Sequence, residues 1–184
     1  MIEIKTPISD ETIDTLNIGD MVYISGKIYT ARDAAHKKLA ELLEAGEKLP
    51  FEPTGQAVFY AGPSPAKPGR SIGSIGPTTA GRMDLYSPLL ISKGLKVMIG
   101  KGLRSREVAD AIVKHRGLYL AATGGIAALM AKCVKSARVI AFEELGTEAV
   151  RELVVEKFPA IVAIDSRGRD LFRSLRAGPA EACL

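Results

Sequence analysis

The first clearly patterned part of the chain is a strand followed by a helix. Residues 21–30 read MVYISGKIYT, which is rich in β-branched and aromatic residues and predicts a strand. Thr30 and Asp33 then form the T-x-x-D pattern of a capping box, which predicts the start of a helix. Gly46 predicts its end, because glycine commonly terminates helices. The apolar positions of this helix, at helical spacing, are Ala35, Leu39, Leu42 and Leu43.

Beyond this pair lies a long segment without regular periodicity, and then an alternation of strand and helix patterns. A short strand, AVFYAGP, precedes residues 63–81, which are rich in Pro, Gly, Ser and Thr. Ile72 and Ile75 within this segment favour an ordered, functional loop. The elements expected after it are a helix at 83–92, or one that begins at Ser87-Pro88, a strand at 95–100, a helix at 105–114 with Ser105 as its cap, and a strand at 117–122. They are followed by a helix at 126–134, a strand at 137–145, a short helix after Gly146, and β-rich runs at 152–158 and 160–165.

This alternation predicts an α/β fold with a mixed sheet. The opening strand–helix piece and the β-rich end argue against a simple doubly wound sheet. The length of 184 residues fits a single domain, 1–184, and a hydrophobic content of 47% excludes a disordered chain. No apolar run approaches the ~18 residues of a membrane helix, and the acidic N-terminal stretch is unlike a signal peptide. We therefore expect a soluble, cytoplasmic protein.

The charge and the cysteines narrow the class of partner. The 25 Lys and Arg exceed the 21 Asp and Glu by a net charge of +4, but they are interspersed and the chain has no Trp. Nucleic-acid binding is therefore disfavoured, and a pocket for a small anion explains the excess at least as well. Cys133 fits an apolar helical pattern and is expected in the core, whereas Cys183 lies in a polar tail. Two cysteines alone cannot hold a zinc ion or a four-iron cluster, which need about three or four ligands.

Three segments place a cation where local structure does not favour one. Arg32 is expected in the first turn of its helix, where the helix dipole disfavours positive charge, and His36 lies one turn later. A bound anion would offset this cost; the alternative is a surface arginine paired with Asp33 or Glu41. Lys101 follows a buried strand and is flanked by two glycines, which leave room for a ligand. The alternative is that Lys101 is a solvent-exposed turn residue.

The third segment, SIGSIGPTTAGRMD, combines glycines, hydroxyls and a cation. Thr78 and Thr79 supply hydroxyls, and Arg82 supplies a bidentate fork for a carboxylate. The alternative is a set of plain turns with Thr79 as a helix cap. Neither nucleotide-binding fingerprint matches the spacing. Close helix packing explains the glycine-rich turn at 123–129, and the alternative is that its backbone N–H groups contribute to a binding site. The turn at 165–169 is interpreted as a terminal hairpin.

Two arginines and a lysine converging on one pocket would suit a small dicarboxylate. A base is harder to find from the residues alone: Asp33 and His36 are candidates by type, and Thr78 would need activation by a nearby cation.

Five segments together resemble the β-subunit family of class I fumarate hydratase. They are TARDAAHKKL, YAGPSPAKPG with GSIGPTTAGRMD, MIGKG, TGGIAALMAKCVK and ELGTEAVRELVVEKFPAIVAID. The same domain forms the C-terminal part of single-chain class I fumarases and the β subunit of L-tartrate dehydratase. The resemblance covers roughly residues 20–172, GPTTAGRMD is its most specific motif, and residues 173–184 look like an added tail.

The resemblance implies half of an enzyme. It implies a swivelling β/β/α domain and a partner α subunit that holds a four-iron–four-sulfur (4Fe-4S) cluster through three cysteines, in an α₂β₂ assembly. By motif, Arg32, Arg82 and Lys101 match substrate-carboxylate contacts, and Thr78 matches the catalytic base, with Lys101 beside it in the catalytic set. The implied reaction interconverts (S)-malate with fumarate and water. The alternatives are tartrate dehydration and a non-catalytic dicarboxylate-binding module.

Overall fold

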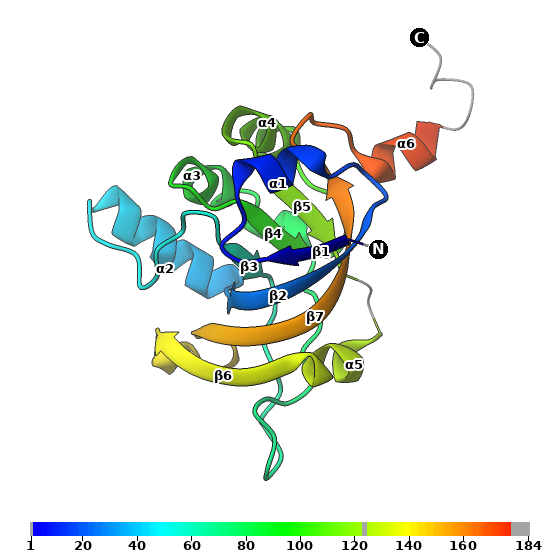
Figure 1. The fold of residues 1–184 in the computed structure, drawn as a ribbon. Helices are drawn as coiled ribbons and strands as arrows, with labels where there is room; N and C mark the ends of the chain where they lie inside the picture. Colours follow the sequence, from blue (N-terminus) through cyan, green and yellow to red (C-terminus); the bar gives the residue numbers. More distant parts are fainter. Residues whose placement is uncertain (1, 123–124, 178–184) are drawn as a thin grey trace.

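The computed structural model describes residues 2–122 and 125–177, which fold around one mixed seven-stranded sheet (Figure 1). The strands are β1 (Ile2–Lys5), β2 (Met21–Thr30), β3 (Ala57–Phe59), β4 (Val97–Gly100), β5 (Leu118–Ala121), β6 (Val134–Ala141) and β7 (Val150–Ile164). The α-helices are α1 (Asp10–Thr15), α2 (Asp33–Glu44), α3 (Ser87–Ser92), α4 (Arg106–His115), α5 (Ala127–Lys132) and α6 (Leu171–Ala177). Two 3₁₀ segments are η1 (Ala80–Met83) and η2 (Glu143–Glu148).

The sheet closes on itself through β7. Strands β2, β3, β4 and β5 pair in parallel in that order, and β7 runs antiparallel to both β5 and β2. β1 adds to β2 in parallel, and β6 adds to β7 antiparallel. The carboxyl ends of β2, β3 and β4 therefore meet at one edge, which is where α/β folds place ligand sites.

Two apolar clusters hold this sheet, one on each face. Ile99 of β4 belongs to the cluster enclosed by the strand ring, which also buries Ile13 of α1. Met98, its neighbour, points the other way into a cluster with Leu39 of α2 and Val108 of α4. Helices α2, α3 and α4 cover that outer face, and Figure 1 shows them on one side of the sheet. Both faces of β4 are thus buried, as is typical of parallel strands.

The structure confirms the predicted α/β class with a mixed sheet, the strand at 21–30 and the helix that Ser105 caps, where Ser105 Oγ accepts from the Val108 amide at 3.4 Å. The prediction of a capping box at Thr30 is wrong. Thr30 is the last residue of β2, paired with Phe59 and Arg151, so the helix starts only at Asp33.

Several boundaries also differ from the prediction. The runs at 152–158 and 160–165 are one strand, β7, which crosses Pro159. Along the edge of β7 that does not face β2, the strand pairs with β6 up to Val155 and with β5 from Ile161. Pro159 lies between these two ladders, so its missing N–H interrupts neither of them. The 3₁₀ segment η2 contains Gly146 instead of following it, and α5 is shorter than expected. Helix α3 begins at Ser87, the later of the two starts that the sequence allowed. The hairpin predicted at 165–169 exists as a turn closed by an Ile164–Asp170 bridge, and α6 follows it, so residues 173–177 of the expected tail are helical.

The elements β1 and α1 were not predicted, and Cys133 is less buried than expected. Cys133 caps the end of α5 and is half-buried against the inner cluster. Cys183 and the pair 123–124 lie outside the described residues. The described residues contain no helix long and apolar enough to cross a membrane.

Candidate functional site

The four residues singled out by the sequence lie at the shared edge of β2, β3 and β4. Arg32 follows β2, and Lys101 follows β4. Thr78 reaches the same edge because its amide donates to the carbonyl of Tyr60, the residue after β3, at 2.6 Å. Three segments far apart in sequence are thus brought together by parallel strand pairing.

Backbone hydrogen bonds fix Thr78 beside Lys101. The Lys101 amide donates to the Thr78 carbonyl at 3.1 Å, and the Ala80 amide donates to the Lys101 carbonyl at 2.8 Å. Gly100 permits this approach, since a Cβ there would lie 3.0 Å from Ala80 Cβ and from a ring carbon of Tyr60. Lys101 is exposed and Thr78 is half-buried. A hydroxyl and an ammonium group therefore share an accessible edge.

Asp33 links the two predicted arginines into one cluster. Arg32 Nε lies 3.0 Å from Asp33 Oδ2, and Arg82 Nε lies 2.7 Å from Asp33 Oδ1. The pairing of Arg32 with Asp33 was the alternative that the sequence left open, and here it coexists with the approach of Arg82. With a guanidinium on each oxygen, Asp33 serves as a counter-ion of both arginines.

His36 does not share this edge. It follows Arg32 by one helical turn, but its side chain is fully buried and packs edge-on against the Tyr60 ring, with centroids 5.0 Å apart. Burial, with the charge of Arg104 as the next cause, lowers the pKa of His36 to about 3. The interpretation of His36 as an accessible base is therefore not supported by its position.

Arg104 is a buried cation that the sequence analysis missed. Its side chain is fully buried, with Nε 2.7 Å from Asp84 Oδ1 and Nη2 2.8 Å from Ser87 Oγ. The guanidinium carbon also lies 5.3 Å and 5.0 Å from the ring centroids of Tyr60 and Tyr119. This network joins the segment that carries Arg82 to the loop that carries Lys101. An arginine within a polar loop gives no sequence signal for such burial.

Glu148 is the second missed residue, and it contacts Arg32 from 116 positions further along the chain. Its Oε1 lies 3.2 Å from Arg32 Nη2. The contact depends on the packing of η2 against α2, which no local pattern predicts.

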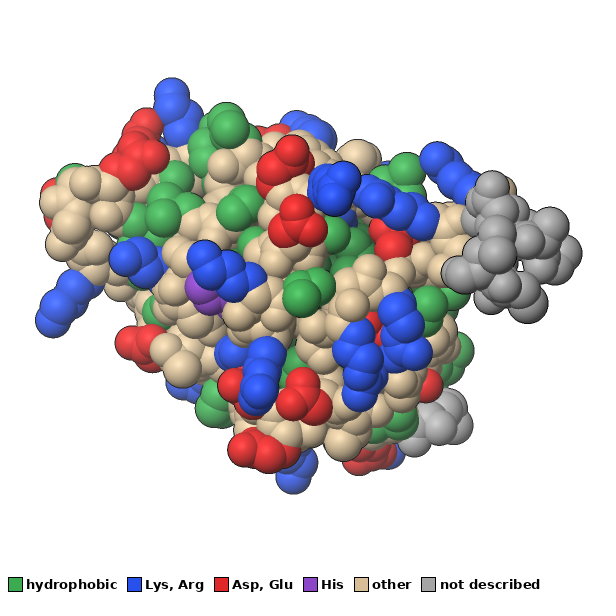
Figure 2. Space-filling view, turned by 90° about the horizontal axis from the view of Figure 1, so that it is seen from above, with side chains coloured by type: hydrophobic (Ala, Val, Ile, Leu, Met, Phe, Trp, Pro, Cys, Tyr) green, Lys and Arg blue, Asp and Glu red, His purple; other side chains and the backbone are tan. Residues whose placement is uncertain are grey.

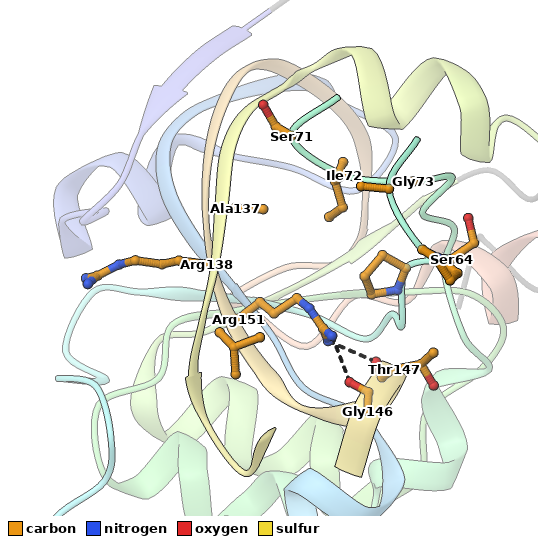
Figure 3. Close-up of a pocket in the computed structure, with 13 residues that line it drawn as sticks. Ser64, Ser71, Ile72, Gly73, Ala137, Arg138, Gly146, Thr147 and Arg151 are labelled. Atoms are coloured by element: carbon orange, nitrogen blue, oxygen red, sulfur yellow. Dashed lines mark hydrogen bonds between the residues drawn. The ribbon is translucent and has the colours of Figure 1, made fainter. Parts of the chain in front are cut away.

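Arg82 and Lys101 lie on an open surface, whereas the Arg32 side chain is only 24% exposed. A cavity of about 350 Å³ is formed instead by the 63–73 loop, β6 and the end of η2, and its lining, drawn from the described residues, includes none of Arg32, Thr78, Arg82 or Lys101 (Figure 3). Arg82 is 50% exposed. Figure 2 shows one face of the molecule, on which Lys and Arg side chains lie among Asp and Glu, in keeping with the interspersed charges of the sequence. Within residues 2–122 and 125–177, no group of three or more His, Cys, Asp or Glu side chains could hold a metal ion.

Comparison with known proteins gives consistent matches along the chain. The family described as "Fumarase C-terminus" matches residues 1–175. Fumarate hydratase 2 of Leishmania major is 41% identical over 175 residues, which are 93% of this chain and 31% of that protein. The anaerobic class I fumarate hydratase of Escherichia coli K12 is 45% identical over 154 residues, which are 83% of this chain and 28% of that protein.

A shorter relative matches almost end to end. The putative L(+)-tartrate dehydratase subunit beta of Methanocaldococcus jannaschii is 41% identical over 174 residues, covering 91% of this chain and 89% of that protein. The chain thus spans about a third of the fumarate hydratases that it matches but most of this separate subunit.

Proposed function

Because the chain belongs to the fumarase C-terminus family, we propose that it is the β subunit of a hydro-lyase that interconverts (S)-malate with fumarate and water. A partner α subunit completes the site. The observation that carries the proposal is the meeting of Arg32, Arg82 and Lys101 at one edge of the sheet, with Asp33 joining the two arginines. Three cations at one exposed edge suit a substrate with two carboxylates.

The net charge of the cluster is small and positive, which suits a substrate with two carboxylates. Arg32, Arg82 and Lys101 contribute three positive charges, and Asp33 and Glu148 contribute two negative ones. The remaining positive charge attracts a dianion, while the acidic partners hold the guanidinium groups in place. In this proposal Arg32 and Arg82 bind the substrate carboxylates, and Lys101 binds a carboxylate and stabilises charge that develops during the reaction.

Thr78 is our proposed base for the C3 proton of malate. Its backbone is fixed on both sides by hydrogen bonds to Tyr60 and Lys101. A threonine hydroxyl is a weak base, and the neighbouring cations Lys101 and Arg82 favour its deprotonated form. Proton removal from C3 and loss of the C2 hydroxyl give fumarate and water.

The 4Fe-4S cluster expected of a class I enzyme does not fit this chain. Cluster ligation needs about three or four thiolates, whereas the sequence has two cysteines, and Cys133 belongs to no group of three or more candidate ligands among the described residues. We therefore place the cluster in the α subunit, in an assembly of α₂β₂ type. The open surface around Arg82 and Lys101 supports the same division, because a substrate bound there by this chain alone would remain in contact with water.

Tartrate dehydration is the second candidate, favoured by the nearly full-length match to a tartrate dehydratase β subunit. The two substrates differ by one hydroxyl on C3. Both have the carboxylates that the arginine and lysine cluster would bind.

Anaerobic co-expression with the candidate α subunit, followed by malate and tartrate dehydration assays, tests the proposal. Turnover of malate that requires both chains is the expected result, and preference for tartrate would favour the second candidate. No turnover of either diacid by a stable complex would contradict both. Fumarate binding by this chain alone, without any α subunit that associates with it, would support a non-catalytic binding module.

Replacement of Arg82 tests the site itself. Arg82→Ala is expected to lower kcat/KM by about two to three orders of magnitude, the usual loss for a charged group that contacts the reacting substrate. Arg106→Ala on α4 is the matched control, since that arginine is highly exposed and pairs only loosely with Asp110, at 3.9 Å. Near-normal turnover of Arg82→Ala would remove Arg82 from the site.

A further inference from the structure

Helix α2, which begins at Asp33, has no capping side chain of its own. Arg32 occupies the N-cap position with an extended backbone, φ −139° and ψ −179°, and its side chain makes no capping hydrogen bond. The first amides of a helix are unpaired donors with partial positive charge, so a guanidinium group there is unfavourable. Asp33 supplies one negative charge in the first turn, and the capping group must come from elsewhere in the chain.

Glu148 supplies that charge. Its Oε2 accepts from the Ala34 amide at 2.8 Å, and its Oε1 lies 3.2 Å from Arg32 Nη2. One carboxylate thus caps the helix and holds the guanidinium group. Asp33 holds Nε of the same group at 3.0 Å, so Arg32 is fixed at two atoms. The side chains of Arg32 and Glu148 are only 24% and 23% exposed, which reduces the screening that weakens surface ion pairs.

The turn that carries this glutamate is ordered by other contacts. Arg151 of β7 donates from Nη2 to the Gly146 carbonyl at 2.7 Å and from Nη1 to the Thr147 carbonyl at 3.2 Å (Figure 3). Gly62 lies against the turn, since a Cβ there would be 2.7 Å from the Thr147 carbonyl oxygen. The turn therefore has anchors that a change in its glutamate side chain would not remove.

We propose that Glu148 is a positioning residue, which orients Arg32 toward a carboxylate of the substrate. The inference rests on the proposed function and assigns to Glu148 a role in substrate binding through Arg32. Loss of its charge frees one side of the guanidinium group, so the group samples more orientations in the unliganded enzyme. Ordering the guanidinium group again when the substrate binds costs free energy, so we expect KM to rise more than kcat falls.

The variant Glu148→Gln separates the two roles of the side chain. Its amide oxygen still accepts from the Ala34 N–H, while the ion pair with Arg32 is lost. In the complex with the α subunit we expect KM for malate to rise about tenfold, typical of one lost charge-assisted hydrogen bond, with kcat within about threefold. The Tm should stay within about 2 °C, because the helix cap remains.

The matched control is Glu144→Gln on the same 3₁₀ segment. Glu144 pairs with Lys38 of α2, not with Arg32, so KM should not change. An equal rise in KM for both variants would show a general loosening of η2, and an unchanged KM for Glu148→Gln would contradict the positioning role.

Arginine labelling by phenylglyoxal tests the same contact without turnover. On the full chain, Glu148→Gln should speed labelling of Arg32 several-fold and leave Arg82, which Glu148 does not touch, unchanged. If the wild-type complex dehydrates neither malate nor tartrate while Arg32 labelling still responds, the proposed function is wrong and the contact is real. If neither labelling nor KM responds to the variant, the positioning role is wrong.

Discussion

The buried imidazole of His36 makes the stability of this protein depend on acid. The side chain has no solvent exposure, and neither ring nitrogen has a hydrogen-bond partner among the residues that the structure describes. Burial lowers the pKa of His36 from its usual 6.5 to about 3. The folded protein thus keeps this histidine neutral through a pH range in which the unfolded chain protonates it.

The sign and size of the effect follow from proton linkage. Above pH 6.5 both states are neutral, and stability is complete with respect to this group. As the pH falls toward 3, only the unfolded state gains a proton, so the free energy of unfolding decreases. At about 1.36 kcal/mol per pH unit, acidification from pH 8 to 4 should cost about 3 kcal/mol through His36 alone. This is a large part of the ~5–15 kcal/mol stability of a typical domain.

The variant His36→Leu isolates this contribution. Leucine is apolar, leaves no unpaired nitrogen and cannot be protonated, so its stability at pH 8 should lie within about 2 kcal/mol of the wild type. Urea unfolding at pH 8 and pH 4, followed by far-UV circular dichroism, gives the free energies. The carboxylates titrate alike in both proteins, so their contribution cancels when the pH-dependent losses of wild type and variant are subtracted. We expect the wild type to lose about 3 kcal/mol more than the variant.

His115, at the end of α4, provides the control, because the sequence contains only two histidines. His115→Gln should retain the acid sensitivity of the wild type. Equal losses for wild type and His36→Leu between pH 8 and pH 4 would refute the reasoning, since they would show that burial of the imidazole has no energetic consequence.

Two further substitutions test how the Thr78–Arg82 and Lys101 segments are held. Arg104→Met should lower the free energy of unfolding by about 3–5 kcal/mol, because it leaves the Asp84 carboxylate without its cation; urea unfolding measures the loss, and a change below 1 kcal/mol would contradict the buried-pair argument. Gly100→Ala should cost about 1–3 kcal/mol and raise KM in the complex, because the new Cβ meets Ala80 and Tyr60 at 3.0 Å; a variant with wild-type KM and Tm would show that this approach is not tight.

The sequence predicted the parts of the site that depend on local chemistry. Arg32 stood out because a cation is unfavourable at a helix start, and the structure shows the compensating carboxylates there. Ser105 was predicted as a cap because its hydroxyl satisfies a nearby amide, and it does. The Thr30 capping box failed because Thr30 is still paired within strand β2, so the N-cap of the helix is Arg32, two residues later. Tertiary pairing outweighed a local signal of about 1 kcal/mol.

What the sequence could not predict depends on long-range packing. Helical periodicity correctly placed His36 one turn from Arg32, but it could not show that Tyr60 covers it. Glu148 and Arg104 are charged residues in polar segments, and their burial depends on neighbours far along the chain. Closure of the sheet likewise requires β7 to pair with both β2 and β5, a property of topology and not of any one segment.

The exposure of the cation cluster explains why this half of the proposed enzyme would need a partner. Arg82 is 50% exposed, and Lys101 also faces solvent. In bulk water, attraction between unit charges 4 Å apart is about 1 kcal/mol, whereas at an effective dielectric constant of 20 it is about 4 kcal/mol. A second body that covers this edge would exclude water and strengthen each carboxylate contact severalfold. The same closure would set the cations against whatever group the partner supplies, so weak binding by the separate chain and strong binding by the complex are two consequences of one geometry.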